Sequence, residues 1–145
     1  VLSYGIKKKR YNELSLKELQ AELHKLVPAE HRNFLAAMED IMIAGDYVFV
    51  HAGIDPKRSI EDQKSSDMRW IRDRFLKHRE PLSHVVVHGH TIFEDVEHTD
   101  YRIGIDTGAF RTGNLTALVL ENDERRLIRA LETDGTITTE SLAFG

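Results

Sequence analysis

The chain has 145 residues, the size of one ordinary domain, so residues 1–145 are expected to fold as a single domain. Its formal net charge of -4 excludes the basic footprint of a nucleic-acid-binding protein. A composition of 41% apolar and 30% charged residues is typical of a globular protein. The sequence has no cysteine, which excludes disulfides and thiol catalysis and leaves histidine, carboxylate or amide groups as the ligands of any metal ion.

The amino-terminal segment lacks the order of a secretion signal. Its apolar residues come before the basic run Lys7–Arg10, whereas a signal peptide has its basic residues first. The sequence also has no apolar run of the length that a transmembrane helix needs. Together with the absence of cysteine, these features predict a cytoplasmic protein with no membrane partner. The basic run itself is expected to be a flexible, solvated loop.

Two amphipathic helices are predicted in the first third of the chain. Leucines recur at helical spacing between residues 15 and 27, and Ser15 followed by Glu18 is typical of a helix-starting capping box. A second apolar stripe, from Phe34 to Met42, predicts another helix that begins at Pro28 and ends near Gly45.

Two buried strands are predicted next, and each leads to a histidine. The first spans Asp46–His51 and the second spans His84–His88, two residues before His90. Between them, residues 52–66 are expected to form a loop, and a third helix is expected to carry Met68, Ile71, Arg72 and Phe75.

The last third of the chain is predicted to be mostly sheet. Strands are predicted at residues 101–106, 114–120 and 125–131, and residues 122–124 are expected to form the turn between the last two. Helices therefore dominate the beginning of the chain and strands the end. The fold class that this order favours is α/β or α+β, a sandwich of sheet flanked by helices.

The two histidines that follow the buried strands are candidate metal ligands. A neutral imidazole at the end of a strand, facing a crevice, is a common way to hold a transition metal. His51 and His90 occupy such positions. Two ligands are too few for a tight or catalytic centre, which usually has at least three from the protein. The sequence therefore predicts half of a metal site.

Neighbouring residues each have a functional and a structural interpretation. His88 either supports a metal ligand or is a strand residue bonded to the backbone, and Asp106 either orients a ligand histidine or caps Gly108. Arg72 either binds phosphate or is a solvated helix residue, whereas Trp70 is expected in the core. The remaining histidines are expected to be solvated: His24, His31, His78, His84 and His98.

Six segments of the chain carry a family resemblance: Ser3–Gly5, Gly45–Gly53, Trp70–Arg72, Val86–Thr91, Ile105–Ala109 and Gly113–Ala117. In this order and spacing they resemble the carboxy-terminal half of a bacterial PPP-type serine/threonine protein phosphatase, one of the calcineurin-like metallophosphoesterases. The resemblance covers nearly the whole chain. The family's amino-terminal motifs, Gly-Asp-x-His, Gly-Asp-x-x-Asp-Arg-Gly and Gly-Asn-His-Glu, are absent.

The resemblance implies a metallophosphoesterase sandwich that is incomplete here, and an enzyme that hydrolyses a phosphoprotein or a small phosphoester. It implies two divalent ions, manganese with iron or zinc as alternatives, which activate a water molecule. His51 and His90 match ligands of one ion, and Arg72 matches a phosphate-binding arginine, with Arg69 and Arg74 close enough to compete for that role. Because the other ligands are missing, the chain alone is expected to be inactive.

Two alternatives to a protein phosphatase remain open. A nearby branch of the same family hydrolyses dinucleoside polyphosphates, and the missing motifs also suit a non-catalytic fragment or binding module. If the gene encodes the Gly-Asp-x-His and Gly-Asn-His-Glu motifs upstream of Val1, an enzyme is favoured. If it does not, a binding module is favoured. In either case, loss of half a sandwich is expected to expose sheet surface, through which the chain would form an oligomer.

Overall fold

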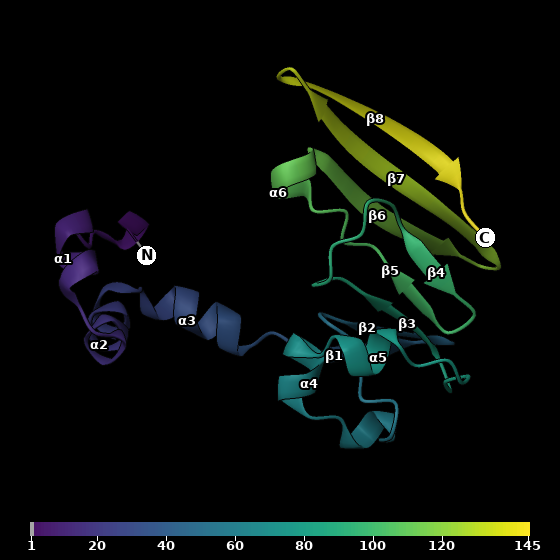
Figure 1. Ribbon diagram of the computed structural model, residues 1–145, viewed down its shortest axis with the longest axis horizontal. Helices are drawn as coiled ribbons and strands as arrows, with labels where there is room; N and C mark the ends of the chain where they lie inside the picture. Colours follow the sequence, from purple (N-terminus) through teal and green to yellow (C-terminus); the bar gives the residue numbers. More distant parts are fainter. Residues whose placement is uncertain (1) are drawn as a thin grey trace. The chain divides into compact units, whose positions relative to one another are not determined.

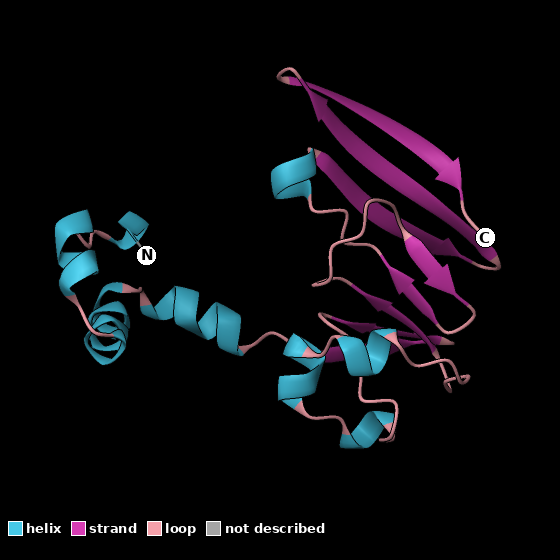
Figure 2. Ribbon diagram, viewed as in Figure 1, coloured by secondary structure: helices cyan, strands magenta, loops and turns pink. Residues whose placement is uncertain are grey.

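The computed structural model describes residues 2–145 and divides into two compact units, which we call the helical unit (residues 2–39) and the sheet unit (residues 40–145). Figure 1 traces the chain through both, and Figure 2 shows that strands occur only in the second. This mixture of helices with two sheets confirms the α+β class at a coarse level. That the chain is one domain stays a prediction. Within residues 2–145, no helix has both the length and the apolar character needed to cross a bilayer.

The helical unit contains a 3-10 turn and three α-helices, η1 (Leu2–Tyr4), α1 (Lys8–Glu13), α2 (Leu16–Leu26) and α3 (Ala29–Ala36). The predicted capping box starts α2: the Glu18 N–H donates to the Ser15 hydroxyl at 3.4 Å, and the Glu18 carboxylate accepts from the Ser15 N–H at 2.9 Å. The expected loop at the basic run was wrong, because α1 includes most of it. Lysine and arginine are good helix formers, which agrees with this finding.

The predicted second helix was wrong in its last part. Helix α3 ends at Ala36, and the apolar residues Ile41–Ala44 form strand β1 instead. This strand pairs antiparallel with β2 (Tyr47–Val50), so that Ile41 lies opposite Val50. Gly45 has a φ of 56° in the turn between them, a value that favours glycine. A short apolar run suits a helix or a strand equally well, and here pairing with β2 decided the outcome.

The first sheet has five strands in the order β1-β2-β3-β5-β4. The remaining strands are β3 (Val85–His88), β4 (Glu97–Thr99) and β5 (Arg102–Gly104). Strands β2, β3 and β5 run parallel to one another. The sequence predicted a strand at each of these three positions, whereas it did not predict the edge strand β4. Because parallel strands end at the same edge, the residues that follow β2, β3 and β5 gather there.

The second sheet is an antiparallel meander in the order β6-β7-β8. Its strands are β6 (Asn114–Glu121), β7 (Glu124–Thr133) and β8 (Thr136–Ala143), and α6 (Ala109–Thr112) precedes them. The predicted hairpin between β6 and β7 is confirmed, but β8 was not predicted. The Tyr47 hydroxyl accepts a hydrogen bond from Arg125 at 2.8 Å, which links this sheet to the first one.

Helices α4 (Ser65–Trp70) and α5 (Asp73–Leu76) pack on the first sheet, as Figure 1 shows, and a 3-10 turn η2 (Ile60–Asp62) precedes them. They replace the single helix predicted here, because Ile71 and Arg72 leave the helical conformation between them. The core of this unit combines both helices with the sheet and the following loop: Val50, Ala52, Ile54, Met68, Ile71, Phe75 and Val86. The expectation that Trp70 lies in the core was wrong, since the helix break leaves it 72% exposed.

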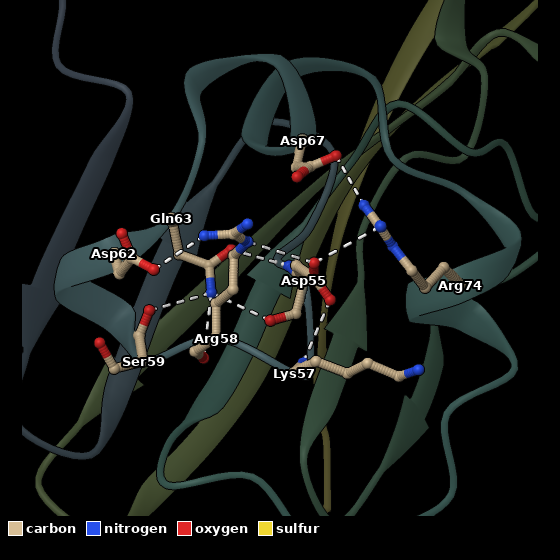
Figure 3. Close-up of polar contacts among 8 residues, drawn as sticks. All are labelled: Asp55, Lys57, Arg58, Ser59, Asp62, Gln63, Asp67 and Arg74. Atoms are coloured by element: carbon tan, nitrogen blue, oxygen red, sulfur yellow. Dashed lines mark hydrogen bonds and ion pairs between the residues drawn. The ribbon is translucent and has the colours of Figure 1, made fainter.

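The loop after β2 is held by a polar network centred on Asp55, which is 6% exposed (Figure 3). Its carboxylate lies 3.5 Å from the Arg58 guanidinium and 3.4 Å from that of Arg74 on α5. Gln63 accepts from the Asp55 N–H at 2.8 Å and donates to its carbonyl at 3.0 Å. The network therefore ties the loop to α5 and satisfies backbone groups that no strand pairs.

We expect Asp55→Ala to lower the free energy of unfolding by about 2 kcal/mol, because it removes a buried carboxylate that pairs with two arginines and accepts from the Lys57 N–H. Urea unfolding measures the change. Asp62→Ala is the matched control: this carboxylate also binds Arg58, at 2.8 Å, but its side chain is 74% exposed. Its loss is expected to cost less than about 0.5 kcal/mol. Equal effects of the two substitutions would contradict a special role for Asp55.

Candidate functional site

The two candidate metal ligands come together at the edge where the parallel strands end. His51 follows β2 directly, and His90 lies two residues beyond β3. Their ring centroids are 5.1 Å apart. The Gly89 N–H donates to the His51 carbonyl at 2.9 Å, and His90 has a φ of 64°, uncommon outside glycine. The backbone thus fixes the two histidines beside each other.

This spacing suits two imidazoles that share one ion. With metal–nitrogen distances of about 2.1 Å and a near-tetrahedral angle, two coordinated rings have centroids roughly 5 Å apart. The Nε2 of His90 is buried and has no hydrogen-bond partner among residues 2–145. A buried nitrogen without a partner is the group that a bound ion would satisfy.

The charge state of His90 also suits a ligand. Burial lowers the pKa of His90 below its usual value, and the nearby positive charge of Arg72 and the ring of His51 lower it further. Asp106 acts in the opposite direction. His90 is therefore neutral at pH 7, with a lone pair available for coordination.

Among the three candidate arginines, only Arg72 has a bond to the segment that carries His90. Its guanidinium donates to the Thr91 hydroxyl at 3.2 Å. The other two are engaged elsewhere: Arg69 pairs with Asp40 at 2.6 Å, and Arg74 pairs with Asp67 at 2.7 Å. The break between α4 and α5 positions Arg72, whose side chain remains accessible from solvent.

His88 is buried in the core rather than exposed at the site. It is 1% exposed and makes edge-on contacts with Phe75 and Phe93, at centroid distances of 5.0 and 6.5 Å. Its Nδ1 lies 3.2 Å from the Gly89 carbonyl, as in the backbone-bonded interpretation. Burial lowers the pKa of His88 to about 4. The side chain is therefore a neutral core group over most of the pH range.

Asp106 follows β5 and caps Gly108, whose N–H donates to Oδ1 at 3.0 Å. It also lies beside the histidine pair. A Cβ atom added at Gly89 would lie 3.9 Å from Oδ2 of Asp106 and 3.7 Å from the carbonyl oxygen of His51. The capping interpretation of Asp106 thus describes its hydrogen bond, and its second oxygen remains next to the Gly89 backbone.

Two neighbours of His90 were not identified from the sequence. Thr91 holds Arg72, and Trp70 lies edge-on to His90 with ring centroids 5.7 Å apart. The sequence offered one indication of both: Thr91 follows His90 directly, and Trp70 lies two residues before Arg72. Trp70 is also the only tryptophan of the protein, so its fluorescence reports on this site.

The site is incomplete as a metal centre. Within the described range 2–145, no three or more His, Asp or Glu side chains are placed so that they could hold one ion together. His51 and His90 fit one ion as a pair of nitrogen ligands, and no ligand set for a second ion accompanies them. Their role as metal ligands stays a prediction.

Comparison with known proteins gives no assignment: no family model and no curated protein matches this chain. The phosphatase resemblance therefore rests on the motifs themselves.

Proposed function

We propose that this chain supplies one half of the active centre of a metal-dependent phosphoester hydrolase resembling a serine/threonine protein phosphatase. One observation carries the proposal: His51, His90 and Arg72 converge from three separate segments on the edge where the parallel strands end. In open α/β sheets this edge is the usual location of ligand sites. The proposal includes an incomplete metallophosphoesterase sandwich as the fold.

His51 and His90 would hold one of two divalent ions, manganese with iron or zinc as alternatives. Such ions, when bound, polarise phosphoryl oxygens and make a bound water more acidic. Arg72 would contact two oxygens of the phosphate with its planar guanidinium, and its bond to Thr91 limits the rotation of that group. The neutral state of His90 at pH 7 means that no proton has to leave before an ion binds.

The missing ligands have to come from another segment or another chain, so the chain by itself is proposed to be inactive. The substrate would be a phosphoprotein or a small phosphoester. A non-catalytic binding role is the competing candidate, because the described residues offer no third ligand near the histidine pair. Metal binding and turnover, measured on the same proteins, distinguish the two roles.

Titration with Mn²⁺ is expected to quench the fluorescence of Trp70, because the paramagnetic ion would bind next to the His90 ring that Trp70 contacts. Since two ligands hold the ion, His51→Ala or His90→Ala is expected to weaken Mn²⁺ binding at least tenfold. His98→Ala is the matched control, because His98 is exposed and lies on β4 away from these contacts. Equal Mn²⁺ affinity in His90→Ala and His98→Ala would contradict the metal site.

The same proteins separate the two candidate functions when they are assayed on a chromogenic phosphate ester with manganese. We expect Mn²⁺ binding without turnover by the isolated chain, and turnover that depends on His90 once the missing motifs are supplied on a second polypeptide. Mn²⁺ binding with no turnover even in that complex would favour the non-catalytic role. Turnover by the isolated chain, lost in His90→Ala, would show that the centre is complete and that the half-site proposal is wrong.

A further inference from the structure

Strand β8 is a long open edge of the second sheet. It is last in the order β6-β7-β8, and all eight of its residues are exposed. The opposite edge strand, β6, is more covered and includes Thr116, which is 8% exposed. The edge strands of the first sheet, β1 and β4, have only four and three residues. β8 is thus the longest exposed edge among the described residues.

The backbone groups that β8 turns outward can be identified. The Phe144 N–H donates to the Arg125 carbonyl at 3.0 Å, which makes this a hydrogen-bonded pair just beyond the strand. Such pairs alternate along an antiparallel ladder. Residues 138, 140 and 142 therefore bond to β7, and the N–H and C=O groups of residues 137, 139, 141 and 143 point away from it.

Nothing in β8 blocks pairing with another strand. Natural edges are usually protected by lysine, proline, a bulge or very short length. The sequence Thr136–Ala143 contains neither lysine nor proline, and its register with β7 continues without a bulge. Its single charge, Glu140, lies 4.0 Å from Arg129 of the neighbouring strand. β-Branched residues, which favour strands, make up half of the segment: Thr136, Ile137, Thr138 and Thr139.

We infer that β8 pairs antiparallel with β8 of a second copy of this chain, so that two meanders join in one continuous sheet. A two-fold axis makes the same strand complementary to itself and closes the assembly at two copies. The inference does not depend on the phosphohydrolase proposal. It gives the expected association through exposed sheet surface a definite location.

The charge of Glu140 selects the register of this pairing. Two neighbouring registers bring the outward groups together. One places Glu140 opposite Glu140 of the second copy, which is unfavourable for like charges. The other register places Thr139 opposite Thr139 of the second copy, and Glu140 opposite Thr138 of the second copy. Threonine pairs across strands are favourable, so we propose the register centred on Thr139.

Single-cysteine variants test this register, because the natural chain has no cysteine. In the proposed pairing, Thr139→Cys places two cysteines across the two-fold axis, at a Cα separation of about 5.5 Å that a disulfide can span. We expect Thr139→Cys to form a cross-linked dimer under mild oxidation at least tenfold faster than Glu140→Cys. Equal rates, or a faster reaction of Glu140→Cys, would overturn the proposed register.

A pair of lysine variants tests the interface itself in sedimentation equilibrium. Thr139→Lys places two like charges at the axis and is expected to raise the dimer dissociation constant at least tenfold. Ile43→Lys adds the same charge to the exposed edge strand β1, where Ile43 is 51% exposed, and is expected to leave dimerisation unchanged. A wild-type chain that stays monomeric at high concentration would overturn the inference, as would dimers that Ile43→Lys rather than Thr139→Lys disrupts. Circular dichroism confirms that both variants are folded.

Discussion

Lowering the pH from 7.5 to 4 is expected to reduce the free energy of unfolding by about 3 kcal/mol through His88 alone. Burial lowers the pKa of this side chain in the folded protein from 6.5 to about 4. In this interval the unfolded chain binds a proton that the folded chain excludes, so stability falls with falling pH. The stability that depends on neutral His88 is fully present above pH 6.5 and is lost as the pH falls toward 4. Each tenfold difference in proton affinity between the folded and unfolded states corresponds to about 1.4 kcal/mol.

Urea unfolding at several pH values, with EDTA to remove metal ions, measures this effect. His88→Leu is expected to flatten the stability profile between pH 4 and 6.5, because it replaces the imidazole with an apolar group of similar volume between Phe75 and Phe93. His98→Ala removes an exposed histidine and should keep the wild-type profile. A profile in His88→Leu as steep as that of the wild type would assign the pH dependence to other groups.

Gly53→Ala is expected to lower the free energy of unfolding by about 3 kcal/mol. An added Cβ would lie 2.3 Å from Cδ1 of Phe75, a fully buried ring, so the core would have to rearrange. Overpacking of this kind costs about 1–3 kcal/mol. Gly53 also has a φ of 143°, and a side chain in such a conformation adds strain of order 1–3 kcal/mol.

Two further variants separate the steric and conformational parts of this effect. Gly45→Ala adds a methyl group at a φ of 56° with nothing within 4 Å, so it should cost only about 1 kcal/mol. Phe75→Leu should reduce the additional cost of Gly53→Ala when both are present, since the smaller side chain leaves room for the methyl group. Additive effects of Gly53→Ala and Phe75→Leu in thermal or urea unfolding would show that the close contact is not the cause.

Much of the fold followed from local signals. Ser15 and Glu18 marked the start of α2, and the β-branched runs before His51 and His90 marked two strands of the first sheet. Errors arose where a local signal suited two structures. The apolar stripe of the second predicted helix runs into Ile41–Ala44, which pairs with β2, and the third helix breaks at Ile71 and Arg72. Strand β8, with every residue exposed, lacks the apolar alternation by which strands are recognised.

The candidate site shows the same division. Chain position alone indicated that His51 and His90 follow strands, and the residue types alone indicated metal and phosphate chemistry. Which arginine turns toward the histidines was not decided locally, because Arg69, Arg72 and Arg74 lie on neighbouring turns and differ in the acidic partners that reach them. The exposure of Trp70 likewise depends on the helix break before Arg72.

The sequence by itself therefore determined the coarse fold class, the main strands and the chemistry available to the histidine pair, because short-range patterns and side-chain types carry that information. The tertiary structure alone decided the parallel arrangement that places the rings of His51 and His90 5.1 Å apart, the partner of each arginine and the open edge at β8. These features arise from contacts between segments far apart in the chain, whose energies no local pattern contains.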